Sequence, residues 1–443
     1  MFAVFLPALN FRGNRSPYLW WFYKLLNEFG KDACFICGEE YFIDPKQLLV
    51  NGRNEASADV AGLYGYGLPD SEPLKQLIRA DIPPNVWLKL ESIYASNPLA
   101  AFRYFCLSHD KDLYLAIENA VKYLESMACV IEVIVTCVNC ATLEIFCKTR
   151  NLPLLHLELG PLRGPVYLPT AYFDFSGVNG NTESKRRFDV ACSDTFIADE
   201  WSEFASLRSL FLMQKLPGQN QATTDLGLGL QIEDDSNIIC YAKGHTSLSL
   251  INGARRMLAD QRIRVPVLVR PHPGSFFSVH NLPTGLRLDC SRTSVDFILQ
   301  CERIHTINSG LTVEAMLLER EVMGYGDCPF AFCINPDNGR CNIDALSFFL
   351  LNYLVPWDLA LKPQYIRWRL NKPPEASIRQ RHLEALMQKK IRLMEGQIAE
   401  LEQALLERER QIAQMRSSLA WRLAYPLQAM LHMFRRLLNQ CRQ

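Results

Sequence analysis

Short apolar runs alternate with amphipathic segments through the first half of the chain. Four runs are typical of buried strands: residues 2–9, 33–37, 130–136 and 152–158. The segments between them that carry apolar residues at helical spacing are 17–29, 112–126 and 141–149. Strand–helix–strand alternation at this spacing predicts a parallel sheet with helices on both faces. Residues 41–100 mix helical and loop signals, so no order of elements is predicted there.

The alternation resumes after a stretch rich in Gly, Pro and Asn at 161–190, which is typical of an interdomain region. Helices are expected at about 197–214, 246–259, 293–300 and 311–318, and strands at 237–241, 265–269, 305–308 and 321–324. The predicted fold class is therefore α/β with two Rossmann-like domains. Residues 1–185 make the N-terminal domain, and residues 186–372 make the C-terminal one.

The tail has a different pattern. Its apolar residues follow the alternating spacing of a heptad for about four heptads, with one break at Arg408; they are Ile391, Met394, Ile398, Leu401, Leu405, Ile412 and Met415. This predicts a coiled-coil helix at 373–416, through which chains could pair into an oligomer. Residues 417–443 lack acidic residues and set arginines among apolar residues and Trp421, as in helices that bind anionic membrane surfaces. The alternative is a helix docked on the protein body.

Composition narrows the class of protein to which the chain can belong. The chain has 443 residues, with 47 basic and 47 acidic side chains, which suits two or three domains and argues against a nucleic-acid partner. Its 15 cysteines are scattered through apolar runs, as expected in a reducing compartment. The two CxxC pairs, Cys34/Cys37 and Cys137/Cys140, have zinc-like spacing but strand-like flanks, so we expect core cysteines and no metal.

The chain gives no targeting signal. The run 1–7 is apolar but lacks the basic region and cleavage site of a signal peptide, and it is better interpreted as a first strand. No window reaches the length of a transmembrane helix. A cytoplasmic protein is therefore expected.

Two strand-end motifs suggest an anion site. In VLVRPHP (267–273), a buried strand stops at a turn that contains Arg270 and His272. In NSGLTVEA (308–315), a turn opens a helix through a Ser cap. Backbone N–H groups at a helix start hold phosphate oxygens, and a cationic side chain adds a charge-assisted contact. Glu314, one turn into the helix, could take ribose hydroxyls, so a nucleotide or nucleotide sugar is expected. Each motif alone is more often a plain loop or an ordinary N-cap.

A third segment, GLQIEDDS (229–236), places three carboxylates just before the strand expected at 237–241. Such a cluster alone is most often a solvated turn. In order, QIEDDS, VRPHP and HTINSGLTVEAMLLEREVMGYG (305–326) resemble the bacterial retaining β-Kdo transferases, which use CMP-β-Kdo to build capsule linkers and cap O-antigen chains. LELGPLRGP (157–165) and FDFSGVNGN (173–181) are similar to family segments too. The His-Pro turn and the Ser-led helix are also similar to those of bacterial sialyltransferases.

The resemblance implies a GT-B-like glycosyltransferase and a role for each matching residue. Asp235, with Asp234 as the alternative register, would be the nucleophile that forms a covalent glycosyl-enzyme. His272 would bind the CMP phosphate and ease its departure, and Glu158 would be the general base for the acceptor hydroxyl. The residues expected to hold the donor are Gln231, Arg270, His272, Asn308, Ser309, Gly310, Thr312 and Glu314. Glu158 could instead be an interdomain salt-bridge partner.

Physical chemistry agrees with these roles. Net retention needs two inversions, hence a carboxylate nucleophile opposite the leaving group. The leaving group is a phosphate monoester, so cationic and N–H stabilisation suffices without a metal. The donor sugar is itself an acid, and Arg163, Arg270 or Lys243 could pair with its carboxylate.

The expected partners are the CMP-sugar donor, a lipid-linked polysaccharide acceptor and the cytoplasmic face of the bacterial inner membrane, bound through the tail. Two alternatives stay open. One is a transferase for another CMP- or UDP-sugar, and the other is a non-catalytic membrane scaffold for polysaccharide assembly.

Overall fold

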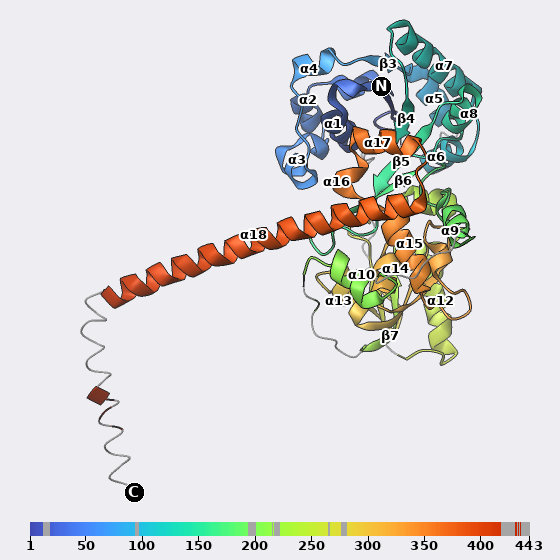
Figure 1. The fold of residues 1–443 in the computed structure, drawn as a ribbon. Coiled ribbons are helices and arrows are strands. Elements are labelled where there is room, and N and C mark those ends of the chain that lie inside the picture. Colours follow the sequence, from blue (N-terminus) through green and yellow to red (C-terminus); the bar gives the residue numbers. More distant parts are fainter. Residues whose placement is uncertain are drawn as a thin grey trace. The chain divides into compact units, whose positions relative to one another are not determined.

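The computed structural model describes residues 1–11, 18–93, 97–193, 201–214, 216, 222–264, 266–275 and 281–417, with four residues of the C-terminal segment, Met430, Leu431, Met433 and Arg435. Residues Met1–Leu386 form one compact unit, and Met387–Gln443 form a second. The first unit contains two sheets (Figure 1). The predicted segment 417–443 lies almost wholly outside the described residues.

The first sheet has the order β12-β6-β5-β4-β1-β2-β3. Its strands are β1 (Phe2–Phe5), β2 (Ala33–Cys37), β3 (Arg79–Asp81), β4 (Val133–Thr136), β5 (Leu154–Leu159), β6 (Thr170–Asp174) and β12 (Val355–Pro356). The five strands β3-β2-β1-β4-β5 run parallel, whereas β6 pairs antiparallel with β5 and β12 antiparallel with β6. The parallel sheet predicted from the first half is confirmed, and β3, β6 and β12 are additions to it.

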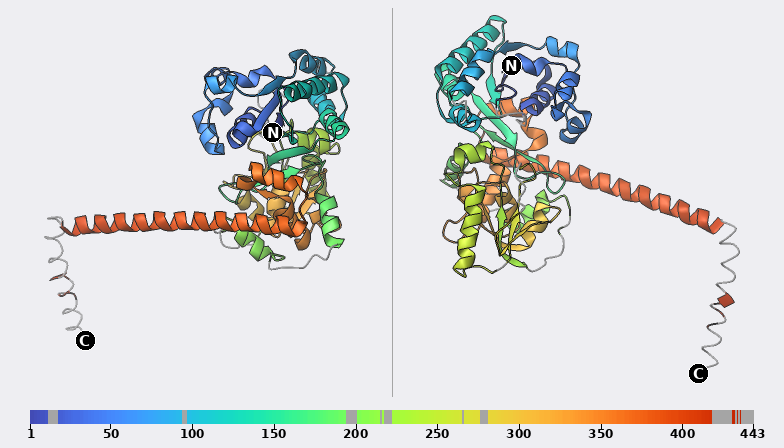
Figure 2. Two further views of the ribbon diagram at one scale, coloured as in Figure 1. Left: turned by 45° about the horizontal axis from the view of Figure 1, so that its top comes forward. Right: turned by 180° about the vertical axis from the view of Figure 1, so that it is seen from behind.

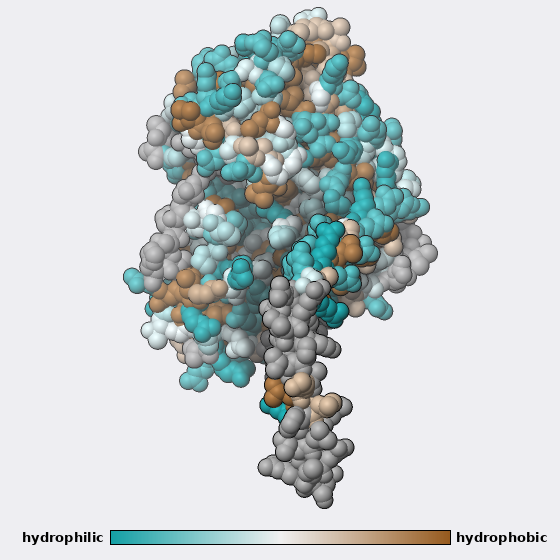
Figure 3. All heavy atoms as spheres, turned by 90° about the vertical axis from the view of Figure 1, so that its left-hand side faces the viewer, coloured by the Kyte–Doolittle hydropathy of each residue, from teal (hydrophilic) through white to brown (hydrophobic). Residues whose placement is uncertain are grey.

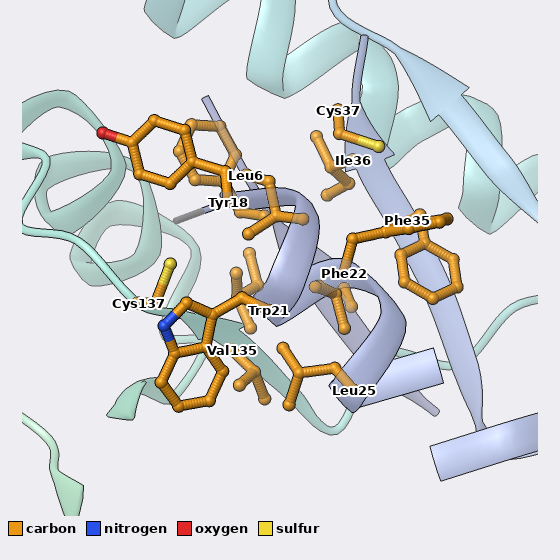
Figure 4. Close-up of a cluster of buried hydrophobic side chains, with 14 of the residues drawn as sticks. Leu6, Tyr18, Trp21, Phe22, Leu25, Phe35, Ile36, Cys37, Val135 and Cys137 are labelled. Carbon is orange, nitrogen blue, oxygen red and sulfur yellow. The ribbon is translucent and has the colours of Figure 1, made fainter. Parts of the chain in front are cut away.

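Helices cover both faces of this sheet (Figure 1). Helix α1 (Tyr18–Phe29) lies on one face, and α7 (Lys111–Ser126) and α8 (Ala141–Arg150) lie on the other. Aromatic residues of α1 pack against β1, β2 and β4, and Cys37 and Cys137 stand at the edges of this apolar cluster (Figure 4). All four CxxC cysteines are buried, which confirms the expectation of core cysteines.

The second sheet is wholly parallel, in the order β11-β10-β7-β8-β9. Its strands are β7 (Thr224–Gly229), β8 (Val267–Arg270), β9 (Leu286–Leu288), β10 (Cys301–Thr306) and β11 (Glu321–Gly324). Helix α12 (Ser247–Ala259) lies on one side of it, and α13 (Ser294–Leu299) and α14 (Leu311–Leu317), which pack together, lie on the other (Figure 2).

One predicted element of this lobe is wrong. The strand predicted at 237–241 is a helix, α11 (Ser236–Tyr241). The strand in this part of the chain is β7, which ends at Gly229, before the predicted strand begins. An apolar run of four residues is too short for periodicity to separate strand from helix. The true strand, TDLGLG, was missed because glycine weakens a strand signal. Gly227 is required there, since a Cβ atom would lie 2.6 Å from the Cys301 Sγ atom and 2.8 Å from the Phe297 ring.

The remaining helices connect and flank the sheets. They are α2 (Pro45–Val50), α3 (Ala58–Tyr64), α4 (Ser71–Lys75), α5 (Pro84–Ser92), α6 (Pro98–Leu107), α9 (Ser184–Ser193), α10 (Phe204–Phe211), α15 (Ile343–Phe348), α16 (Trp357–Ala360), α17 (Pro363–Leu370) and α18 (Glu375–Ser417). Among the described residues, no helix is long and apolar enough to cross a membrane. The face drawn in Figure 3 is mainly hydrophilic, with small separate apolar groups.

The chain crosses between the two sheets twice. It leaves the first sheet after β6 and returns to it at β12, beside which α16 and α17 pack. Arg187 on α9 joins the two crossings. Its guanidinium donates to Glu375 at 2.7 and 2.9 Å and to the Asn352 carbonyl at 3.1 Å. The side chain is only 8% exposed, so this ion pair is a buried one.

Candidate functional site

The topology of the second sheet places a crevice between β7 and β10. From β7, the chain adds β8 and β9 on one side and β10 and β11 on the other, so the direction of winding reverses there. In such sheets, ligands bind beyond the carboxyl ends of the strands at this reversal. The predicted segments at 231–236, 270–273 and 308–314 follow the carboxyl ends of β7, β8 and β10. The structure therefore brings all three to one crevice.

A buried side chain joins two of these turns. Gln231, 6% exposed, accepts a hydrogen bond from the Asn308 backbone N–H at 3.0 Å. The Asn308 side chain donates to the carbonyls of Asn237 and Asp327 at 3.0 and 3.2 Å. The turn after β10 is thus held by hydrogen bonds from both the backbone and the side chain of Asn308.

Three buried oxygen atoms near this turn lack a hydrogen-bond partner among the described residues. They are Thr306 Oγ1, Asn308 Oδ1 and Thr312 Oγ1. Buried polar atoms are nearly always hydrogen-bonded, to protein, water or ligand. Their concentration around one turn is what a ligand pocket would show.

The start of α14 differs in detail from the expectation. Gly310, not Ser309, occupies the N-cap position, and it makes no side-chain cap bond. The Ser309 hydroxyl accepts from the Leu311 N–H at 3.3 Å. A Cβ atom on Gly310 would lie 3.0 Å from Cβ of Pro161, so glycine permits the first lobe to approach this turn closely.

Asp235 and His272 lie within electrostatic reach of each other. Asp235 caps α11, with its carboxylate accepting from the Asn237 N–H at 2.8 Å. Burial lowers the pKa of His272 below its ordinary value, and the charges of Asp235 and Glu233 oppose that shift, while the charge of Arg163 adds to it. His272 Nδ1 accepts from the Gly274 N–H at 3.0 Å. A neutral ring therefore carries its proton on Nε2, where it can be donated to a ligand.

Glu314 is a carboxylate with a strongly perturbed environment. Burial raises its pKa from the ordinary value of 4.5 to about 7, and hydrogen bonding to Ser294 and Tyr167 and the charges of Arg270 and Arg163 oppose the rise. Its Oε2 atom accepts from the Ser294 hydroxyl at 2.6 Å. Carboxyls with raised pKa values in a crevice are frequent at functional sites.

The first lobe contributes to the same crevice. Glu158 lies near the end of β5, as expected. Arg163 follows in the next loop, is exposed, and donates from Nε to the Gly160 carbonyl at 2.9 Å. This loop approaches the turn after β10, because a Cβ atom on Gly310 would lie 3.0 Å from Cβ of Pro161.

The three candidate cations have different partners. Arg270 forms an ion pair with the buried Asp289 and donates to the Ser291 carbonyl at 3.2 Å. Lys243 forms an ion pair with Asp327 at 2.6 Å. Within the described part of the chain, Arg163 forms no ion pair with a carboxylate. Arg163 is thus the one of the three whose charge is available to a ligand.

Sequence reasoning missed the contacts that hold the Asp235 helix. The Asn139 side chain, which follows β4, donates to the Tyr241 hydroxyl at 2.6 Å, and the Asn179 side chain donates to the Ser236 hydroxyl at 2.8 Å. Both donors belong to the first lobe and both acceptors to α11. The segment FDFSGVNGN, singled out in the sequence only by resemblance, contains Asn179. Nothing around Asn139 signals its role.

Comparisons with known proteins show which families and structures the chain is similar to. Residues 4–183 match the model of the glycosyltransferase 99 family N-terminal domain. The first lobe is thus similar to the N-terminal domain of that glycosyltransferase family, and the match ends near the boundary between the two lobes. The two parallel-sheet α/β lobes predicted from the sequence are present. No curated protein matches the chain.

Solved structures similar to the chain include two from Thermosulfurimonas dismutans. One is "KpsC, beta Kdo 2,7 transferase", with 18% identity, a TM-score of 0.39, and coverage of 54% of this chain and 82% of that one. The other is "KpsC, beta Kdo 2,4 transferase", with 16% identity, a TM-score of 0.38, and coverage of 54% and 87%. The glycosyltransferase SnogD from Streptomyces nogalater has 13% identity, a TM-score of 0.27, and coverage of 87% and 96%.

Proposed function

We propose that the protein transfers β-Kdo from CMP-β-Kdo to a cell-surface polysaccharide, O-antigen or capsule, with retention of configuration. The observation that carries the proposal is the contact of the three motif segments at one edge of the second sheet: Gln231 accepts from the Asn308 N–H at 3.0 Å, and Glu233 accepts from the Ser275 hydroxyl at 3.2 Å. The glycosyltransferase domain at 4–183 supports it, as does the ordered resemblance to β-Kdo transferases.

The donor nucleotide occupies the crevice beside residues 308–312. The unpartnered oxygens of Asn308 and Thr312 suit a ligand with hydrogen-bond donors, such as a ribose or a cytosine amine. His272 donates a hydrogen bond from Nε2 to the phosphate as CMP departs, which stabilises the developing charge while the proton stays on the ring. Glu314 accepts from the ribose hydroxyls. Because the leaving group is a phosphate monoester, the proposed reaction needs no activating metal.

The reaction is a double displacement. A carboxylate oxygen of Asp235 bonds to the anomeric carbon while the bond from that carbon to the phosphate oxygen breaks, and CMP leaves with the electron pair. Glu158 then takes the proton of the acceptor hydroxyl, whose oxygen displaces Asp235 from the anomeric carbon. Two inversions give net retention. Asp235, four residues after Gln231, matches the resemblance best as the nucleophile, with Asp234 as the alternative register.

Arg163 binds the carboxylate of the donor sugar. The other two candidate cations already pair with Asp289 and Asp327, whereas Arg163 is exposed and held only through Nε. Its two terminal nitrogens are then oriented to form the bidentate contact that guanidinium groups make with carboxylates.

Asp235→Asn tests the nucleophile, with Asp234→Asn as the matched control. Each variant is incubated with CMP-Kdo, generated in situ, and a synthetic acceptor. We expect Asp235→Asn to lose transfer and Asp234→Asn to keep it. Mass spectrometry of the unmodified protein without acceptor should find a Kdo adduct on the peptide that contains Asp235. Full transfer by Asp235→Asn, or no CMP release with any acceptor, would contradict the proposal.

Arg163→Met tests donor recognition, with Arg287→Met, an exposed arginine on the edge strand β9, as its control. We expect Arg163→Met to bind CMP normally and to lose transfer of Kdo. Thermal shift with a panel of CMP- and UDP-sugars separates this donor from the alternative ones, since a ligand of the folded state raises the melting temperature. Stabilisation by a neutral UDP-sugar but not by CMP would replace the donor assignment.

We further propose that the protein binds the inner face of the bacterial inner membrane through residues 417–443, and acts there on a lipid-linked acceptor. The basic, acid-free composition of this segment supports the assignment. Deleting residues 417–443 should move the protein from the membrane fraction to the soluble fraction. If the truncated chain stays with membranes, the tail is not the attachment.

A further inference from the structure

Helix α18 carries a row of exposed apolar residues beyond Leu386. The members of this row are between 46% and 70% exposed; they are Met387, Ile391, Met394, Ile398, Leu401, Leu405, Ile412 and Met415. Most helical stability in proteins comes from packing an apolar face and not from intrinsic propensity. We therefore expect a second surface to pack against this row. The heptad positions of the helix indicate which surface that is.

The core positions favour two strands. With Ile391 at heptad position a, the other a residues are Ile398, Leu405 and Ile412, and the d residues are Met387, Met394, Leu401, Arg408 and Met415. β-Branched residues at a favour two-stranded over higher-order coiled coils. Three of the four a residues are isoleucine, and isoleucine is absent from d, where it would favour trimers or tetramers.

The flanking charges select a parallel orientation. Position e is glutamate in three consecutive heptads, at Glu395, Glu402 and Glu409, and the g residues five positions before them are Lys390, Gln397 and Ala404. An antiparallel pair aligned about its centre would set glutamates against glutamates, because e faces e in that arrangement. A parallel pair sets Glu395 against Lys390 and the other two glutamates against the uncharged Gln397 and Ala404. The glutamates at position e are thus kept apart from one another when the two helices run in the same direction.

The polar residue in the core fits the same arrangement. Arg408 occupies d, where a parallel in-register pair sets it opposite Arg408 of the other helix, and Glu409 at position e of that helix lies beside it and offsets the like charge. The two opposite charges can therefore pair across the seam twice, once on each side. A buried polar layer of this kind fixes the register of a coiled coil at a cost in stability.

We infer that residues 387–415 form a parallel two-stranded coiled coil with the same segment of a second copy of this chain. The exposure of the apolar row and the charges beside it support this pairing. It does not depend on the donor or on the nucleophile proposed above.

Light scattering of the full-length protein in solution tests the pairing. The expected mass is twice 50.7 kDa. Leu401→Glu places a charge in the seam and should give the monomer mass, whereas Gln403→Glu, on the outward f position of the same heptad, should leave the dimer intact. Circular dichroism and CMP release by both variants check that the catalytic lobes remain folded. A monomeric unmodified protein, a trimer, or a dimer that persists in Leu401→Glu would overturn the inference.

Disulfide trapping tests the orientation. In a parallel, in-register pair, Leu401→Cys lies opposite its own counterpart, so oxidation should yield a peptide linked 401 to 401, identified by mass spectrometry. Gln403→Cys, which faces outward, should yield no such symmetric link. Arg408→Leu should lower the dimer dissociation constant, because it replaces the polar layer with an apolar one. A dimer without the 401–401 link would refute parallel pairing.

Discussion

Glu314→Gln should make the stability of the protein less dependent on pH. The wild-type carboxyl has a pKa of about 7 in the folded protein and an ordinary value of 4.5, because burial disfavours its charged form. Between these two values the folded protein binds more protons than the unfolded chain. The free energy of unfolding therefore falls as the pH rises through this window, and glutamine, which does not titrate, removes that fall.

The size of the effect follows from the shift. A difference of 2.5 pKa units between the folded and unfolded states corresponds to about 3 kcal/mol once the pH exceeds both values. Between pH 5 and pH 7.5, about 2 kcal/mol of that difference should develop. The hydrogen bond from the Ser294 hydroxyl is retained in the variant, because a glutamine carbonyl also accepts.

Chemical denaturation of the wild-type protein and of Glu314→Gln at a series of pH values measures this difference in the free energy of unfolding. The stability of Glu314→Gln relative to wild type should rise by about 2 kcal/mol from pH 5 to pH 7.5. Glu302→Gln, which removes an exposed carboxylate from β10 in the same sheet, is the matched control for loss of a charge. A stability difference for Glu314→Gln that stays constant across this range, or that falls, would refute the reasoning from burial.

Two further substitutions test the packing of the crevice. Gln231→Ala leaves the buried Asn308 N–H without its acceptor and should cost about 1–3 kcal/mol in chemical denaturation, with weaker CMP binding; unchanged values would remove Gln231 from the site. Gly227→Ala pushes a methyl group against Cys301 Sγ and should cost about 1–3 kcal/mol, whereas Gly253→Ala, in open space on α12, should be neutral or stabilising. Equal stability of the two alanine variants would show that β7 relaxes around the added methyl group.

The sequence predicted most of the two sheets because their strands and helices alternate with strong apolar periods. The runs at 33–37 and 321–324 coincide with β2 and β11. Prediction failed at β7 and α11, where a strand contains glycine at alternate positions and a short helix is apolar for four residues. In both places tertiary packing outweighs local preference, since Gly227 is demanded by α13 and α11 is held by the first lobe.

The candidate site was only partly accessible from the sequence. The residues after β7, β8 and β10 were found because strand ends and ordered motifs are local signals. The choice among Arg163, Arg270 and Lys243 was not accessible, because it depends on which cations already have partners, and neither Asp289 nor Asp327 belongs to a motif that signals such a pairing. The supporting role of Asn139 was invisible for the same reason, since its partner is 102 residues away.

The two chain crossings between the lobes have a mechanical consequence. A single connection would let one lobe both swing and twist relative to the other, whereas two connections fastened side by side leave one rotational degree of freedom. Arg187 on α9 holds the two connections together, since its guanidinium donates to Glu375 and to the Asn352 carbonyl. Any rotation of one lobe relative to the other would therefore be confined to the axis through the two connections, and it would have to break the hydrogen bonds from Asn139 and Asn179 to α11.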